Sequence, residues 1–321
     1  AQCDLVIEAI IEDLPAKQAL FEQLESHLAP TAVIASNTSS LPIARLARSL
    51  REPARFVGMH FFNPATVMKL VEVVSGPATD AAVAIRIAEL AQGWGKVAVP
   101  VADVPGFIVN RVARPFYGEA FRCLQQQGAA PEVIDHLFRN SAGFKMGPLE
   151  LTDLIGQDIN FAVARSVHES YFGQTRFVPQ LVQAALVDAN WLGRKTGRGV
   201  YDYSAGTPAA APSPCAGEAH LSAPARPQEV KVGECFELDG SILMLSRGRT
   251  ARTESTELGK PVAVLDWFDA ATATSAGFSA SNEEAAQTAI GLLKAWNLDP
   301  YRLSDRPGLI VLRTLAQIAN S

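Results

Sequence analysis

The sequence predicts an α/β fold: a parallel sheet, then a purely helical segment, and then a second, smaller α/β segment. Three observations support this prediction. Short apolar runs alternate with amphipathic stretches up to residue 102, and helical spacing alone fills residues 107–190. A stretch rich in Pro, Ala, Ser and Gly then precedes a final region that regains order. Strand–helix alternation of this kind is typical of parallel sheets whose faces are covered by helices.

Each element of the first region has its own signal. Buried strands are indicated by short apolar runs, and the first helix by apolar Ala16, Leu20 and Leu24 at helical spacing behind Pro15. The predicted strands span residues 5–10, 32–35, 56–59, 70–74 and 97–101, and the predicted helices span residues 15–28, 42–50 and 81–93.

The later segments differ in composition. Predicted helices span residues 107–127, 131–140, 148–171 and 179–190. Residues 204–228 contain five prolines and lack the apolar residues of a core, so we expect a flexible linker there. Beyond residue 229, a strand over 262–265 and a helix over 283–296 are predicted.

The composition excludes several classes of protein. With 48% hydrophobic and 19% charged residues, the 321-residue chain is expected to be globular. A net charge of −5 without a Lys/Arg block predicts neither a nucleic-acid nor a membrane partner, and no run approaches the roughly 18 apolar residues of a membrane span. The four cysteines are scattered, so no metal site is predicted, and without a signal peptide we expect a cytoplasmic protein.

An internal repeat connects the first region to the last. Residues 103–111, DVPGFIVNR, align with residues 305–313, DRPGLIVLR, and Trp94 and Trp296 each lie nine residues before these motifs. The chain is therefore expected to contain two copies of an α/β-then-helical unit, the second ending in mid-helix at Ser321. Asn110 corresponds to Leu312, and one alignment places Asp266 at the position of His60, so we expect a non-catalytic second copy.

Polar residues in the first copy predict a catalytic site. His60 lies near the end of a predicted strand, and Glu72 follows twelve residues later inside the next apolar run. A carboxylate can fix the tautomer of an imidazole and favour its uptake of a proton, which suits acid–base catalysis near neutral pH. Ser39 and Asn110 could hydrogen-bond a substrate oxygen. From spacing alone, a structural core histidine with incidental Ser and Glu neighbours is the favoured interpretation.

Five strings, in chain order, resemble the L-3-hydroxyacyl-CoA dehydrogenase family: IASNTSSLPI, RFVGMHFFNPATVMKLVEVV, DVPGFIVNR, MGPLELTDLIG and GRKTGRGVYDY. The resemblance covers nearly all of residues 4–203. The linker and the degenerate repeat resemble the longer bacterial enzymes of phenylacetate and 3-hydroxybutyryl-CoA metabolism. The resemblance implies a Rossmann-type sheet, NAD as cofactor, oxidation of (S)-3-hydroxyacyl-CoA to 3-oxoacyl-CoA in fatty acid or phenylacetate-type degradation, and a homodimer formed through the helical domain.

The resemblance also implies residue roles. His60 is the general base, Glu72 pairs with it, and Ser39 and Asn110 bind the region of the substrate's 3-oxygen. Besides Ser39, the cofactor-binding residues implied are Glu12, Lys17 and Lys195, the last reaching NAD from the helical domain. Simpler explanations stay open: turn or cap roles for Ser39 and Asn110, a surface strand charge for Glu72, and solvated charges for the others.

The Gly-rich motif that binds the pyrophosphate of NAD is missing from the sequence, which limits the expectation that this chain binds NAD. Nicotinamide-binding sheets hold the pyrophosphate on a Gly-rich turn after their first strand, and residues 1–100 contain no G-x-G-x-x-G. We therefore expect a fragment that lacks the Gly-rich part and binds NAD poorly or is inactive. A related His-dependent dehydrogenase of a small hydroxy or sugar acid is the alternative function. The expected domains are 1–102 (Rossmann part), 103–203 (helical), 204–228 (linker), 229–304 (reduced Rossmann-like) and 305–321 (start of a second helical domain).

Overall fold

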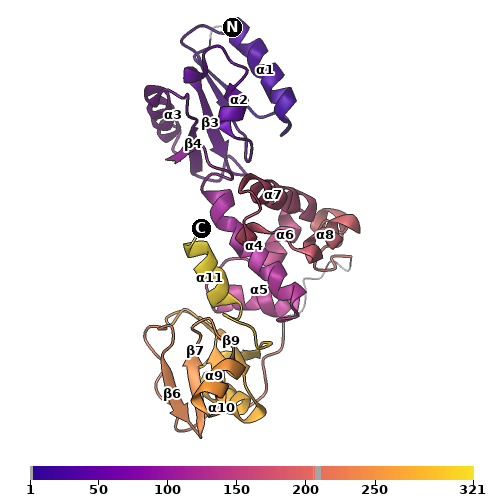
Figure 1. The fold of residues 1–321 in the computed structure, drawn as a ribbon, viewed down its shortest axis with the longest axis vertical. Helices are drawn as coiled ribbons and strands as arrows, with labels where there is room; N and C mark the ends of the chain where they lie inside the picture. The colour runs from indigo at the N-terminus through magenta and orange to yellow at the C-terminus, as the bar shows by residue number, and fades with distance from the viewer. Residues whose placement is uncertain (1–2, 205, 207–210) are drawn as a thin grey trace. The chain divides into compact units, whose positions relative to one another are not determined.

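The computed structural model of the protein describes residues 3–204, 206 and 211–321. Residues 1–2 of the expected Rossmann part and residues 205 and 207–210 of the expected linker lie outside this description. Two compact units are present (Figure 1). The first comprises residues 1–112 and 169–172, and the second comprises residues 113–168 and 173–321.

The first unit contains a five-stranded sheet in the order β1-β2-β3-β4-β5. Its strands are β1 (Leu5–Glu8), β2 (Val33–Ser36), β3 (Phe56–Phe61), β4 (Leu70–Ser75) and β5 (Val97–Ala102). This confirms the predicted fold class, with one difference: β3 and β4 are antiparallel, whereas the other neighbours are parallel. Residues 62–69 return the chain without a crossover helix, and such a direct return produces an antiparallel pair.

Helices cover both faces of this sheet. They are α1 (Leu14–His27), α2 (Ile43–Ala47) and α3 (Ala81–Gly93), with a 3-10 turn, η1, at Pro53–Arg55. Phe21 of α1 and Ile43 of α2 pack with Phe56 in one apolar cluster, whereas Ile87 of α3 packs with Val57 in another. Alternate strand residues therefore face opposite helix layers, as expected for a sheet buried on both sides.

The helical segment continues from the first unit into the second through α4 (Val109–Gln125). It includes α5 (Pro131–Asn140), α6 (Pro148–Ile155), α7 (Gln157–Ser170), η2 (Thr175–Phe177), α8 (Leu181–Asp188) and η3 (Arg194–Thr196). The single helix expected over 148–171 is instead two helices, because Gly156 between them has φ 107°. Glycine alone adopts this region readily, so the helix ends there.

A second five-stranded sheet has the order β10-β9-β8-β7-β6. Its strands are β6 (Cys235–Leu238), β7 (Ser241–Leu245), β8 (Val262–Leu265), β9 (Ser275–Ala280) and β10 (Asp299–Arg302), and its helices are α9 (Ala251–Leu258), α10 (Glu283–Ala295) and α11 (Val311–Ala319). As in the first sheet, one internal pair, β8/β9, is antiparallel and is followed by a parallel one, β9/β10. The expected repeat is therefore a repeat of structure.

The helices and the second sheet are joined directly within the second unit. Ser141 Oγ donates to the carbonyl of Ser275 at 2.7 Å, and the backbone N–H of Asp269 donates to the carbonyl of Ser141 at 2.7 Å. The two predicted domains 103–203 and 229–304 thus share a compact unit.

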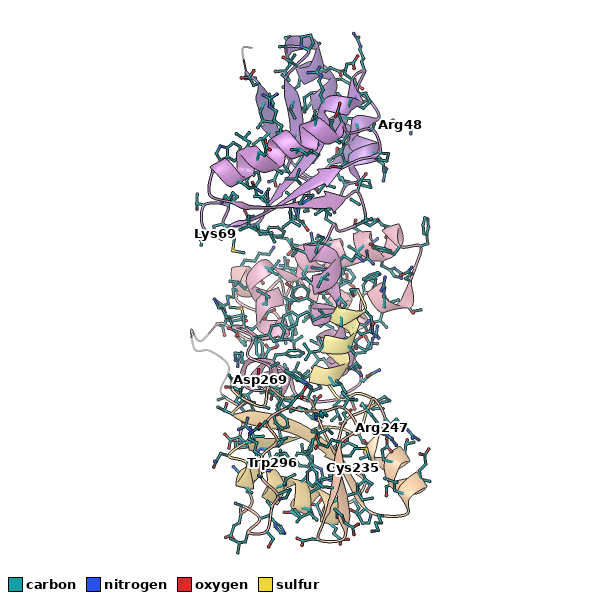
Figure 2. The ribbon with its side chains drawn as sticks, turned by 90° about the vertical axis from the view of Figure 1, so that its left-hand side faces the viewer. Arg48, Lys69, Cys235, Arg247, Asp269 and Trp296 are labelled. Atoms are coloured by element: carbon teal, nitrogen blue, oxygen red, sulfur yellow. The ribbon has the colours of Figure 1, made fainter. Side chains whose placement is uncertain are left out.

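The predicted flexible linker 204–228 needs correction for its described part from residue 211. Trp296, labelled in Figure 2, donates from Nε1 to the carbonyl of Pro224 at 2.8 Å. The backbone N–H groups of Cys215 and His220 donate to the carbonyls of Pro300 and Gly291 at 2.8 and 2.9 Å. Proline-rich composition indicated an unstructured chain, but backbone hydrogen bonds and packing hold this segment against α10 and β10.

Candidate active site

The central pair of the candidate site comes from the antiparallel strands β3 and β4. His60 and Glu72 are directly opposite in the strand register. His60 Nδ1 lies 2.7 Å from Glu72 Oε2, and the two residues are 6% and 1% exposed. Side chains of directly opposed strand residues point the same way, so the twelve-residue spacing is what brings the imidazole and carboxylate together.

Glu72 also contacts the start of α4. Its Oε1 accepts hydrogen bonds from the backbone N–H groups of Ile108 and Val109 at 2.9 and 3.0 Å. A carboxylate is favoured at a helix N-terminus, where N–H groups have no helical partner. With both Glu72 oxygens accepting, the proton between the side chains belongs to His60 Nδ1, and Nε2 is left as the basic nitrogen.

Ser39 and Asn110 also lie together. Asn110 Nδ2 donates to the backbone carbonyl of Ser39 at 3.1 Å. The turn that carries Ser39 follows β2 and is joined to β3, because Asn37 Oδ1 accepts from the backbone N–H of Phe61 at 2.9 Å. Glu72 thus anchors the start of the helix that carries Asn110, and the first unit contains all four residues expected to be catalytic.

Glu12 organises the serine turn. Its Oε1 accepts from Thr38 Oγ1 at 2.7 Å and from the backbone N–H groups of Ser39 and Ser40 at 2.9 and 3.1 Å. Burial opposes ionisation of Glu12, but the hydrogen bonds and the charge of Lys17 outweigh it, so the pKa of Glu12 lies below its ordinary value. Glu12 is therefore an ionised anchor of the turn.

Lys17 is not a solvated charge of the helix start, and its contact with NAD stays a prediction. Its side chain is fully buried, and Nζ lies 2.7 Å from Glu8 Oε1 and 3.3 Å from Glu12 Oε2. Glu8, the last residue of β1, was not singled out from the sequence. A lone carboxylate in the apolar run LVIEAI is the same signal that identified Glu72 in LVEVV.

Lys195 lies in the second unit, where Nζ is 2.6 Å from Asp158 Oδ1. Both side chains are partly exposed. This ion pair accounts for the position of Lys195 in the structure, and its contact with NAD stays a prediction.

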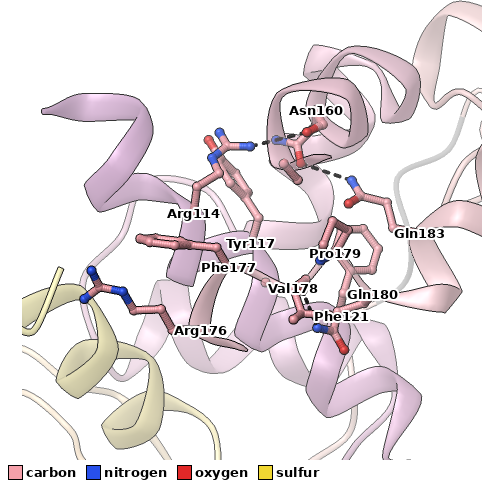
Figure 3. Close-up of a pocket in the computed structure, with 12 residues that line it drawn as sticks. Arg114, Tyr117, Phe121, Asn160, Arg176, Phe177, Val178, Pro179, Gln180 and Gln183 are labelled. Atoms are coloured by element: carbon pink, nitrogen blue, oxygen red, sulfur yellow. Dashed lines mark hydrogen bonds between the residues drawn. The ribbon is translucent and has the colours of Figure 1, made fainter. Parts of the chain in front are cut away.

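A pocket in the second unit is too small to hold an acyl chain (Figure 3). It has a volume of about 20 Å³, which is room for roughly one water molecule. Arg114 donates to the backbone carbonyl of Asn160 at 3.3 Å, and Gln183 donates to Asn160 Oδ1 at 3.0 Å. Burial lowers the pKa of Arg114 to about 10. These groups form a structural polar network.

The first unit has groups that fit part of a dinucleotide. Ligands of open α/β sheets bind outside the carboxyl ends of the strands. Glu12 and Ser39 follow β1 and β2 at these ends, and they supply a fixed carboxylate and a hydroxyl suited to the polar ribose and nicotinamide groups. No residue is assigned to the pyrophosphate, because the sequence contains no G-x-G-x-x-G.

Comparison with protein families shows three consecutive matches. Residues 1–104 match the NAD-binding domain of 3-hydroxyacyl-CoA dehydrogenase, and residues 106–203 match its C-terminal domain. Residues 243–307 match the reduced Rossmann-fold domain of 3-hydroxybutyryl-CoA dehydrogenase. The expectation of a fragment that lacks the N-terminal part of the NAD-binding domain is not borne out, because the first match begins at residue 1.

Individual relatives show the same similarity. The chain is 45% identical to 3-hydroxyadipyl-CoA dehydrogenase of Escherichia coli. The alignment covers all of this chain and 67% of the relative. It is 44% identical to a probable 3-hydroxybutyryl-CoA dehydrogenase of Bacillus subtilis over 62% of the chain and 69% of the relative. The crystal structure of 3-hydroxybutyryl-CoA dehydrogenase from Escherichia coli K12 superposes with a TM-score of 0.92, covering all of this chain and 67% of that one at 44% identity.

Proposed function

The chain belongs to the 3-hydroxyacyl-CoA dehydrogenase family, and on this premise we propose how its residues carry out NAD-dependent oxidation of a 3-hydroxyacyl-CoA to a 3-oxoacyl-CoA. The observation that supports the proposal most is the buried His60–Glu72 pair, with its Nδ1–Oε2 distance of 2.7 Å. NAD, when bound, supplies the acceptor for the hydride that leaves C3.

His60 acts as the general base. Its Nε2 takes the proton of the 3-hydroxyl group, while Nδ1–H stays hydrogen-bonded to Glu72. The imidazolium that forms is stabilised by the adjacent carboxylate, which is already oriented by the N–H groups of Ile108 and Val109. Ser39 and Asn110 orient the 3-oxygen by hydrogen bonds and so select the hydroxyl group that His60 reaches.

We further propose that the chain represents the longer bacterial form of the family. The repeat beginning near residue 229 and the match of residues 243–307 support this assignment. We infer from the two Escherichia coli relatives that short acyl groups are the substrates: the four-carbon 3-hydroxybutyryl-CoA or the six-carbon dicarboxylic 3-hydroxyadipyl-CoA.

Absorbance of NADH tests this proposal. A protein containing the whole chain, mixed with NAD, is expected to produce NADH from (S)-3-hydroxybutyryl-CoA or (S)-3-hydroxyadipyl-CoA and none from gulonate. Oxidation of gulonate without oxidation of either thioester would support the alternative, a dehydrogenase of small sugar acids. NADH formation from none of the three would contradict the proposed substrate class.

The cytoplasmic location and the homodimer stay part of this proposal. Among the residues that the structure describes, no helix has the length and apolarity to cross a membrane. The dimer is inferred from the family resemblance, and light scattering after gel filtration should give twice the mass of one chain. The mass of a single chain would contradict it.

A further inference from the structure

A buried ion pair lies behind the turn that carries Ser39. Glu8 is the last residue of β1, and Lys17 lies in the first turn of α1. Their side chains are fully buried, and Lys17 Nζ is 2.7 Å from Glu8 Oε1. Removing two charges from water is costly, and a buried ion pair is weak evidence for stability, so this pair requires another explanation.

Every oxygen of Glu8 is occupied. Oε1 also accepts from the backbone N–H of Ile10 at 2.6 Å, and Oε2 accepts from Ser36 Oγ at 2.6 Å. Glu8 therefore joins the ends of β1 and β2 to the start of α1. The geometry leaves its carboxylate one orientation, which holds the ammonium group of Lys17 in place.

Lys17 transmits this orientation to Glu12. Nζ lies 3.3 Å from Glu12 Oε2, so the ammonium group draws one oxygen of Glu12 inward. The other oxygen, Oε1, then faces the turn and accepts from Thr38, Ser39 and Ser40. A continuous series of charged contacts thus runs from Glu8 through Lys17 and Glu12 to the backbone of Ser39.

We propose that Glu8 is a positioning residue for the cofactor and substrate site. It fixes Lys17, which fixes Glu12, which holds the Ser39–Ser40 turn at the ends of β1 and β2. The proposal rests on the function proposed for Ser39, but the position of the turn is measurable without NAD. On this proposal, the role of the buried charges of Glu8 and Lys17 is to hold the Ser39–Ser40 turn in place and not to stabilise the fold.

Hydrogen exchange of the Ser39 and Ser40 amides tests the position of the turn directly. Glu8→Gln keeps the size of the side chain and removes the charge that holds Lys17, so we expect faster exchange of both amides in the full chain. Glu25→Gln is the matched control. Glu25 is a carboxylate on α1 whose side chain is 8% exposed, and it accepts from the backbone N–H groups of Arg51 and Glu52 at 2.9 Å and not from the serine turn. It should leave Ser39 and Ser40 unchanged.

The effect of the Glu8 substitution on cofactor binding is measured by fluorescence titration with NADH, which gives the Kd for NADH. Loss of hydrogen bonds to a charged group corresponds to about a ten- to hundredfold rise in the Kd for NADH in Glu8→Gln. The double variant Glu8→Gln with Lys17→Met removes both charges and should restore most of the thermal stability. It should keep the high Kd, because Glu12 still lacks its ammonium partner.

These experiments can contradict the positioning role of Glu8 and the proposed dehydrogenase function independently of each other. Unchanged exchange of Ser39 and Ser40 in Glu8→Gln would overturn the positioning role whether or not NADH binds. Recovery of both stability and NADH affinity in the double variant would overturn it too, since the pair would then be purely structural. Failure of the unmodified protein to bind NADH would count against the proposed function alone, because the exchange measurement would still stand.

Discussion

At the scale of single residues, the two oxygens of Glu72 serve two partners. Oε2 accepts from His60, and Oε1 accepts from the backbone N–H groups of Ile108 and Val109. A carboxylate that accepts from both sides cannot rotate without losing a hydrogen bond. Glu72 therefore fixes the imidazole and the start of the helix that carries Asn110 with one side chain.

Glu72→Gln separates these two contacts. A glutamine can still accept from Ile108 and Val109, but its amide nitrogen then faces His60 and forces the wrong tautomer on the imidazole. We expect kcat to fall about 10²–10⁴-fold, with a melting temperature close to that of the unmodified protein. Glu72→Ala should lose activity and stability together. A Glu72→Gln protein with kcat within a few-fold of the original would contradict the role of the pair.

The sequence predicted this pair but missed Glu8 for a physical reason. Both carboxylates stand in apolar strands, where an unpaired charge is costly, so each implied a partner. For Glu72 the partner was a histidine on the neighbouring strand. For Glu8 it was Lys17, which the family resemblance assigned to the cofactor and whose burial depends on packing between β1, β2 and α1.

At the scale of elements, buried aspartates hold the end of the helical segment. Asp135 of α5 accepts from the backbone N–H groups of Leu149 and Glu150 at the start of α6 and from Tyr201 Oη at 2.7 Å. Asp153 accepts from the backbone N–H groups of Val200 and Tyr201. These contacts explain why residues 200–203 close the segment.

Asp135 makes a pH dependence testable. Burial raises the pKa of Asp135 from 3.8 to about 6 despite its hydrogen bonds. The folded protein thus favours the protonated form, and this contribution to stability is complete below pH 4 and is lost as the pH rises through 6. A shift of about two units corresponds to about 3 kcal/mol.

Urea unfolding of the original protein and of Asp135→Asn isolates this contribution, because asparagine does not titrate. The difference in the free energy of unfolding, original minus variant, should decrease by about 3 kcal/mol from pH 4 to pH 7. A difference that stays constant or increases with pH would show that the folded protein does not favour protonated Asp135.

At the scale of the whole molecule, the two sheets use equivalent contacts with different residues. Asp103 accepts from the backbone N–H groups at the start of α2, and Asp305 does the same at the start of α9. In the second copy Asp266, opposite Gly277, occupies the place of His60 opposite Glu72. Its carboxylate accepts from Ile310 and Val311, the counterparts of Ile108 and Val109. The contact with the helix remains, without a histidine.

Asp266→Ala should therefore affect stability and leave catalysis intact. Asp266 is fully buried, and its loss leaves the N–H groups of Ile310, Val311 and Leu312 without their acceptor. We expect the free energy of unfolding to fall by about 3 kcal/mol or more, since each unsatisfied buried donor costs about 1–3 kcal/mol. The kcat of the folded fraction should be unchanged, and Asp266→Asn should be intermediate in stability. A selective loss of kcat would give the second copy a catalytic role.

Much of the fold could be predicted from the sequence, and the predictions that failed have identifiable physical causes. Every strand and helix expected in the first region is present within a few residues, because apolar periodicity there is strong. In the last region β8 was the only strand predicted, together with the helix α10. Of the strands that were missed, β6 and β10 are short and partly exposed, so they carried no such signal. The direction of β3 against β4 depends on the return of residues 62–69, which periodicity alone does not report.

The central claim is that His60 is the catalytic base and that no residue of the second copy replaces it. The measurement is the kcat of His60→Ala with NAD and (S)-3-hydroxybutyryl-CoA, beside His27→Ala at the end of α1 as control. We predict a fall of about 10²–10⁴-fold in kcat for His60→Ala, and full activity and unchanged thermal stability for the His27→Ala control. Turnover by His60→Ala within tenfold of the original protein would contradict the account.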